Sequence, residues 1–296
     1  MKRKRSSKIK ERAIEGILLL SALSSIFITL SIVFILFYEA SGFFRDVSIW
    51  EFLTGTQWTP LFAQPKFGIL PLVSGTLLVT GIAVLVALPV GLIVAVYLSE
   101  YAPFKIKEVA KPILELLAAV PTVVYGYFAL LFLTPILRNF IPELSGFNAL
   151  SPGIIMGIMI IPYVSSVSED SMKAVPMQIR EGSYAMGATK FQTAFKVVIP
   201  SAFSGIAAAF IIGISRAIGE TMVVAIAAGM MPNLTLNPIE PIQTLTAYIV
   251  GVSLGDVPHG TIEYKTIFAA GITLFFMTLC LNILGFWFRR RIREVY

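Results

Sequence analysis

Residues 169–200 read EDSMKAVPMQIREGSYAMGATKFQTAFKVVIP, a polar stretch that separates two apolar runs of the chain. These runs cover residues 152–168 before it and 201–229 after it. A run of roughly 20 apolar residues is long enough to cross a hydrocarbon core about 30 Å thick. The pattern therefore predicts two membrane-spanning helices joined by a long polar loop, and the rest of the chain repeats this pattern in both directions.

The composition agrees with a chain that lies mostly in lipid. Of the 296 residues, 56% are hydrophobic and 14% are charged, whereas soluble domains carry about 25% charged residues. We predict an all-α membrane protein with one transmembrane domain, 14–288, between basic termini at 1–13 and 289–296. The six predicted spans are Ile14–Tyr38, Ile69–Leu98, Pro112–Leu137, Pro152–Ser168, Ser201–Gly229 and Ile267–Phe288. Prolines 89, 121 and 162 interrupt spans, which is tolerated where neighbouring helices bond the freed carbonyls.

The basic residues predict the orientation of the chain. Segments 1–13, 99–111, 169–200 and 289–296 together hold 18 of the 23 Lys and Arg residues. Because positively charged loops stay in the cytoplasm, we expect both termini and the 169–200 loop to be cytoplasmic. Because these basic residues cluster at span ends, the net charge of +6 indicates interaction with an anionic membrane surface rather than with nucleic acid.

The sequence lacks the residues that several classes of enzyme require. The chain has one Cys and one His, so an internal disulfide, a cysteine metal cluster, a zinc hydrolase site and a Ser-His-Asp arrangement are excluded. A P-loop needs a Gly-Lys pair, and no Gly-Lys pair occurs. We therefore expect a chain that is not an enzyme and binds no cofactor or metal, so that any ATP-Mg it depends on is hydrolysed by other subunits.

The 169–200 loop is longer than a connection between two spans requires. Its periodicity predicts two short helices joined near Gly187, with an apolar face that includes Tyr184, Phe191 and Phe195. Such a face on the cytoplasmic side has to be covered by lipid or by another protein. The alternative is an ordinary solvated loop.

The same loop resembles the EAA loop of binding-protein-dependent ABC importer permeases. Glu181, Gly187 and Pro200 have the spacing of that motif, while Gly182 and Ser183 stand where the family has two alanines. The resemblance implies a type I importer permease fold, and it implies that the loop docks into the ATP-binding subunit. These five residues are the candidate ATPase-coupling residues.

A charged pair lies inside the fifth predicted span. At about 100° per residue, Arg216 and Glu220 share one face with Gly205, Ala209 and Gly213, small residues that allow another helix to approach closely. One interpretation is a structural ion pair. The other is a gated anion site, in which Glu220 holds Arg216 at rest and Arg216 binds a tetraoxyanion during transport. With Thr221, these two residues form the candidate substrate pathway.

The wider sequence is similar to permeases of the high-affinity phosphate-specific transport system, C-type rather than A-type. The motifs are SRAIGETM at 215–222, FGILP at 67–71 and AVPTVVYG at 119–126. The resemblance implies phosphate import across the cytoplasmic membrane by alternating access. It also implies a sister A-type permease as heterodimer partner, two ATP-binding subunits and an extracytoplasmic phosphate-binding protein. Sulfate, molybdate or phosphonate import stays open as an alternative, as does an ion-driven secondary carrier or an anion channel.

Overall fold

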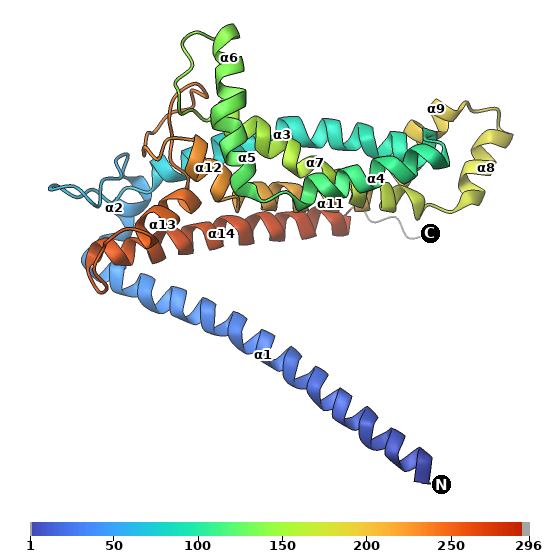
Figure 1. The fold of residues 1–296 in the computed structure, drawn as a ribbon, viewed down its shortest axis with the longest axis horizontal. Helices are drawn as coiled ribbons and strands as arrows, with labels where there is room; N and C mark the ends of the chain where they lie inside the picture. Colours follow the sequence, from blue (N-terminus) through green and yellow to red (C-terminus); the bar gives the residue numbers. More distant parts are fainter. Residues whose placement is uncertain (1, 292–296) are drawn as a thin grey trace.

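The computed structural model describes the backbone of residues 2–291 and the side chains of residues 10–287, and Figure 1 shows its helices. Of the predicted basic C-terminal segment 289–296, only the backbone of residues 289–291 is described, and the side chains of residues 1–9 and 288–296 lie outside the description. The longer helices are α1 (Lys2–Asp46), α3 (Leu70–Val96), α4 (Phe104–Ala119), α7 (Leu150–Lys173), α11 (Phe203–Ile218) and α14 (Ile262–Arg291). The shorter ones are α2 (Ile49–Thr54), α5 (Thr122–Phe128), α6 (Thr134–Phe140), α8 (Met177–Ala185), α9 (Lys190–Thr193), α10 (Ile199–Ser201), α12 (Met222–Ala227) and α13 (Leu245–Ser253).

The predicted number of spans agrees with these helices when one bent pair counts as a span. Five helical segments of the described chain are long and apolar enough to cross a membrane, beginning at Lys10, Leu70, Thr122, Leu150 and Ile262. The sixth is the pair 190–201 and 203–218, which is bent by 72°. The all-α membrane class is confirmed.

The centre of the bundle is a close-packed contact of α3, α7 and α11, which lie side by side in Figure 1. Gly157 of α7 packs on Val86 of α3, where an added Cβ would lie 2.7 Å from the valine Cβ. Val164 of α7 in turn packs on Gly91 of α3 and Gly213 of α11, where an added Cβ would lie 2.7 and 2.9 Å away. Small residues let the helix backbones approach this closely, so the predicted small face of the fifth span is confirmed as a packing face.

The third predicted span, Pro112–Leu137, is wrong as a continuous helix. Helix α4 ends at Ala119, Val120 and Pro121 are extended, and α5 begins at Thr122. In Figure 1, α4 runs along the bundle and α5 and α6 rise across it. Pro121 favours the break, because proline disfavours helical geometry in the residue before it.

The two ends of the bundle carry different structures. Helices α8 and α9 lie at one end, toward which α1 begins and α14 ends, while α2, α12 and α13 lie at the other. At that second end an aromatic cluster joins α1, α2 and α13; it comprises Phe43, Phe52, Trp58, Phe67 and Tyr248. Burial raises the pKa of Tyr248 to about 12, so its hydroxyl stays protonated and shares a hydrogen bond with Thr266 at 2.5 Å.

Candidate functional site

Arg216 lies in the last turn of α11, on the side of that helix that packs against α7. Its guanidinium carbon lies 4.3 Å from the centre of the Tyr163 ring. The side chain is half-buried, and its Nε atom is buried without a hydrogen-bond partner. A charged side chain at the centre of a membrane-spanning helix costs roughly 2.5–3.5 kcal/mol on insertion scales, and contact with an aromatic face offsets part of the cost of burying a cation. The cation is therefore stabilised while keeping donor capacity.

The predicted ion pair between Arg216 and Glu220 is not formed. Within the described residues, no ion pair joins them, because α11 ends at Ile218 and the chain leaves the helix at Gly219. The fifth span is thus not one helix from Ser201 to Gly229, and the one-turn spacing of the two charges no longer holds. Glu220 instead accepts hydrogen bonds from the backbone N–H of Met222 at 3.1 Å and of Val223 at 3.3 Å, the free donors at the start of α12.

Glu220 and Thr221 form the break between α11 and α12. Glu220 is buried, and its backbone carbonyl accepts a 2.7 Å hydrogen bond from the hydroxyl of Thr246 on α13. The Thr221 hydroxyl donates to the Gly219 carbonyl at 3.2 Å. The structure thus brings all three predicted pathway residues into one segment, 216–221, and among their described side chains Arg216 carries a buried donor without a partner.

Tyr163 joins this segment to the break in the third span, and the sequence analysis missed it. Its hydroxyl donates to the carbonyl of Ala118 at 3.4 Å, and the hydroxyl of Tyr125 donates to the carbonyl of Leu117 at 2.7 Å. These carbonyls belong to the last turn of α4, where no following turn can bond them. The expectation that neighbouring helices bond the carbonyls freed by a proline is confirmed at Pro121.

The predicted coupling loop contains the two short helices α8 and α9, joined at Gly187 as expected. Gly187 has a φ of +81°, the left-handed geometry in which glycine is favoured. Glu181 and Gly182 are exposed on α8, and the hydroxyls of Ser183 and Thr193 lie 2.9 Å apart, which ties α8 to α9. Pro200 lies in α10, next to the 72° bend that separates this region from α11.

The loop exposes a large apolar surface. Exposed side chains on α8, α9 and the connections beside them are Met177, Tyr184, Met186, Phe191 and Phe195. Met186, next to Gly187, is 88% exposed. Single exposed apolar residues are ordinary, but a cluster of this kind marks an interaction surface.

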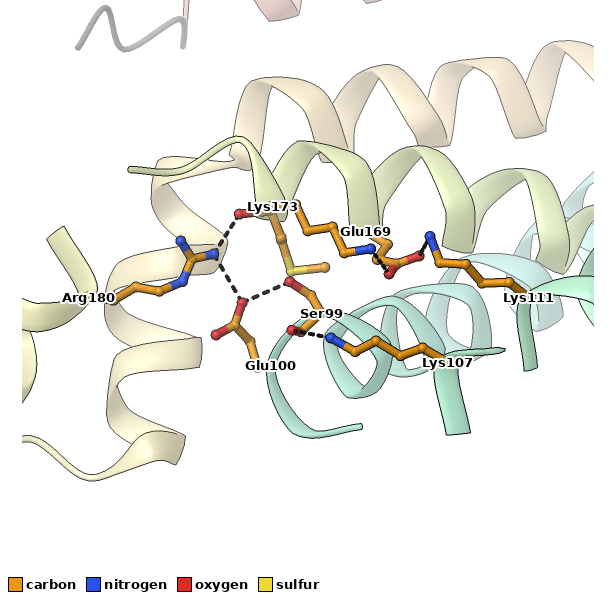
Figure 2. Close-up of polar contacts among 8 residues, drawn as sticks. Ser99, Glu100, Lys107, Lys111, Glu169, Lys173 and Arg180 are labelled. Carbon is orange, nitrogen blue, oxygen red and sulfur yellow. Dashed lines mark hydrogen bonds and ion pairs between the residues drawn. The ribbon is translucent and has the colours of Figure 1, made fainter. Parts of the chain in front are cut away.

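Two buried carboxylates behind this surface were also missed, and Figure 2 shows both. Glu100 is paired with Arg180 of α8 at 3.2 Å. Glu169 of α7 is paired with Lys111 of α4 at 3.1 Å and with Lys173 of its own helix. The four-residue spacing of Glu169 and Lys173 was visible in the sequence, but no local pattern connects Glu100 to Arg180.

Residues 87–294 match the family described as binding-protein-dependent transport system inner membrane component. The chain belongs to this family. It is 34% identical over 92% of its length to a probable ABC transporter permease protein, YqgH, of Bacillus subtilis, of which it covers 89%. It is 32% identical to a probable phosphate transport system permease protein, PstC, of Methanocaldococcus jannaschii, with 78% of each chain covered. A phosphate transport system permease protein PstC of Xylella fastidiosa is 30% identical, with 79% of this permease and 77% of the relative covered.

Solved structures of importers share the permease's fold. The structure of a bacterial alginate ABC transporter, in complex with an alginate pentasaccharide-bound periplasmic protein, contains a chain that matches with a TM-score of 0.66 at 17% identity; the match covers 97% of the permease and 98% of that chain. An inward-facing structure of the MetNI methionine ABC transporter matches with a TM-score of 0.60 at 19% identity, covering 76% and 96%.

Family membership determines the general role of the permease. It is a multi-pass inner-membrane subunit of an ABC importer, a class that works with ATP-binding subunits and substrate-binding proteins. The relatives are transport permeases rather than enzymes. The resemblance seen in the 181–200 motif is thereby confirmed, and the ion-driven secondary carrier and the channel are set aside.

Proposed function

We propose that the permease moves inorganic phosphate into the cell by alternating access, as the C-type half of a heterodimer with a sister A-type permease. Two ATP-binding subunits drive it, and an extracytoplasmic phosphate-binding protein delivers the anion. Its termini and its coupling loop face the cytoplasm. The PstC names of two relatives support phosphate as the substrate. The position of α8 and α9 at the end where α1 begins and α14 ends supports the orientation.

One observation carries the anion site: Arg216 is charged, half-buried and without a carboxylate partner in the described chain. Charged residues inside spans usually face a protein interior or a wet route and mark a substrate pathway. Guanidinium suits a tetraoxyanion because it presents planar donors and stays protonated.

The neighbours of Arg216 give the site a resting state. The ring of Tyr163 covers the guanidinium when no anion is bound. The carboxylate of Glu220, occupied by the backbone N–H groups that begin α12, adds negative charge nearby and keeps the net attraction for the anion weak. Thr221 bonds back to Gly219 across the break between α11 and α12, in which Glu220 lies. Weak binding is required because a transported ion has to leave again.

The 181–187 segment is the proposed contact with the ATP-binding subunit. Glu181 and Gly182 lie on the exposed side of α8, Gly187 forms its terminal turn, and the apolar surface around Met186 needs a protein cover. Movement of the motor subunits would therefore act on α8 and α9 first, and Pro200 lies where that movement meets the bend into α11.

The test is phosphate uptake by the complete transporter in proteoliposomes. Arg216→Gln should abolish uptake while assembly with the ATP-binding subunits persists, and Arg45→Gln, an exposed arginine at the end of α1, should transport normally. Uptake by the Arg216→Gln variant at the wild-type rate would overturn the anion site. Competition of unlabelled sulfate, molybdate, phosphonate and phosphate against the uptake of labelled phosphate identifies the substrate. If one of the other anions inhibits uptake more strongly than unlabelled phosphate does, that anion is the substrate.

A further inference from the structure

Arg180 lies in the middle of the coupling loop but is turned away from its exposed surface. Its neighbours Glu181 and Gly182 are exposed, whereas Arg180 is 9% exposed. Lysine and arginine are almost never buried to this degree without partners. A residue that contacts another subunit would lie on the exposed side, so the role of Arg180 has to be sought within the permease itself.

The guanidinium of Arg180 bonds to two other segments of the chain. It donates to the backbone carbonyl of Met172 in the last turn of α7, at 2.7 Å, and to that of Val175, just after the helix. It also donates to Glu100 at 3.2 Å, in the turn Tyr97–Tyr101 that continues α3. The terminal carbonyls of a helix lack partners within the helix and attract a cation. Arg180 thus caps α7 and joins α8 to both α7 and α3.

The carboxylate of Glu100 is held in place for its contact with Arg180. Its side chain is 7% exposed, and the carboxylate oxygen that accepts from Arg180 also accepts from the hydroxyl of Ser99 at 2.8 Å. A buried carboxylate left without its cation is strongly destabilised, because the charge stays desolvated and uncompensated. The pair therefore resists separation and behaves as a rigid connection.

A second carboxylate makes the surrounding region rigid. Glu169 holds Lys111 of α4 against α7, and Lys173 closes the same carboxylate from the other side. Figure 2 shows Glu100 bonded to Arg180 and Ser99, and Glu169 further along between Lys173 and Lys111; among the labelled side chains only Arg180 comes from α8. Lys107 of α4 also donates to the carbonyl of Ser99 at 3.4 Å, in the turn that continues α3. Among the described side chains, polar contacts thus join α4 to both α3 and α7, and Arg180 is the charged connection from α3 and α7 to α8.

We propose that Arg180, with Glu100, is a positioning residue that makes α8 move as one body with α3 and α7, so that ATP hydrolysis on a bound motor subunit is transmitted to the transmembrane helices. This inference rests on the proposed function of the 181–187 segment. The ion pair does not contact the motor or the anion; it sets how much of the movement of α8 reaches the helices that surround Arg216.

The test measures phosphate imported per ATP hydrolysed by the complete transporter in proteoliposomes, together with the amount of ATP-binding subunit that co-purifies. Glu100→Gln removes the charge and leaves the bonds of Arg180 to α7 in place. Glu108→Gln, an exposed carboxylate on α4, is the matched control. Glu100→Gln should lower the transport ratio about tenfold, the factor of one charge-assisted hydrogen bond, while hydrolysis and co-purification persist. Arg180→Gln should lower it further, and adding Glu100→Gln to Arg180→Gln should not restore the transport ratio, because the connection is already broken.

An unchanged transport ratio in Glu100→Gln would overturn the inference. So would equal losses of hydrolysis, uptake and co-purification, because that result indicates a fold-stabilising pair and no transmission. If the Arg180→Gln variant does not assemble, the transport ratio of the Glu100→Gln variant still tests the inference. Failure of the proposed function gives a different result, since the wild-type complex itself would then import no phosphate or would retain no motor subunit.

Discussion

Replacing Tyr163 by leucine tests whether its ring competes with the anion for Arg216. Leucine keeps an apolar side chain on α7 but removes the π face that lies 4.3 Å from the guanidinium carbon. Cation–π contacts contribute roughly 0.5–1 kcal/mol at exposed sites and about 2 kcal/mol when desolvated. Arg216 is half-buried, so we take about 1–2 kcal/mol, which corresponds to a five- to thirtyfold change in an equilibrium constant.

The direction of the effect follows from the resting state. Without the ring, nothing has to be displaced from the guanidinium when the anion arrives, so phosphate should bind the permease about five- to thirtyfold more tightly. Tyr163→Phe keeps the ring and loses only the long hydrogen bond to Ala118. Because both variants lose that hydroxyl, the difference between them isolates the ring.

The assay is binding of radiolabelled phosphate to the purified complex without its binding protein, so that the measured affinity belongs to the membrane site. We expect Tyr163→Phe to bind within about twofold of wild type, since the ring that covers the cation is kept. Equal affinities in the Phe and Leu variants would refute the resting role of the ring. Weaker binding in Tyr163→Leu would show instead that the ring helps to hold the anion.

Two glycine pairs give the remaining predictions. Gly187→Ala forces a side chain into a φ of +81° and should cost about 1–2 kcal/mol, seen as less co-purifying ATP-binding subunit. Gly146→Ala, outside the coupling loop and with open space at its Cβ position, should retain the subunit. Gly157→Ala places a Cβ 2.7 Å from Val86 and 2.9 Å from a backbone carbonyl of α3, and overpacking of about 1–3 kcal/mol should exceed the gain of about 1 kcal/mol in helix propensity. Gly81→Ala, which has open space at its Cβ position on α3, should show that gain alone. The free energy of unfolding in mixed detergent micelles measures both variants, and an equal loss in the two would contradict the packing argument.

The spans that the sequence predicted well are those whose boundaries depend on local composition. The second was expected at Ile69–Leu98, and α3 covers Leu70–Val96 before its π turn. Likewise Gly187 was expected to join two short helices, and it does so because a left-handed turn is a property of a few residues. An apolar run or a glycine turn needs no information from distant parts of the chain, so both can be read from one segment.

The breaks were not predictable in this way. Prolines 89, 121 and 162 all lie in apolar runs, yet α3 and α7 continue through Pro89 and Pro162, and only Pro121 separates two helices. What distinguishes Pro121 is the pair of tyrosine hydroxyls that bond the freed carbonyls of α4, and one of them comes from another helix. The outcome therefore depends on helix packing, which the sequence around each proline does not contain.

The charged residues show the same limit. Arg216 and Glu220 were expected to pair because they are four residues apart, but Gly219 ends α11 between them and Glu220 bonds to the start of α12. A glycine followed by two potential capping residues was the signal for this break. For Glu100 and Arg180, 80 residues apart, no periodic pattern exists, and each looks like an ordinary solvated charge in the sequence.

The two proposed sites meet in the contrast between α7 and α11. Helix α7 has 24 residues, about 36 Å by its rise, and continues unbroken from the carbonyl of Met172, which Arg180 binds, to Tyr163 about 14 Å away. Helix α11 is interrupted at both ends, by the 72° bend before Phe203 and by the break at Gly219. A displacement of α8 would therefore reach Tyr163 through one continuous helix, whereas Arg216 lies on a segment that is bounded by a bend and a break. Relative movement of ring and guanidinium is the change that this arrangement permits, and it is the change that an anion gate requires.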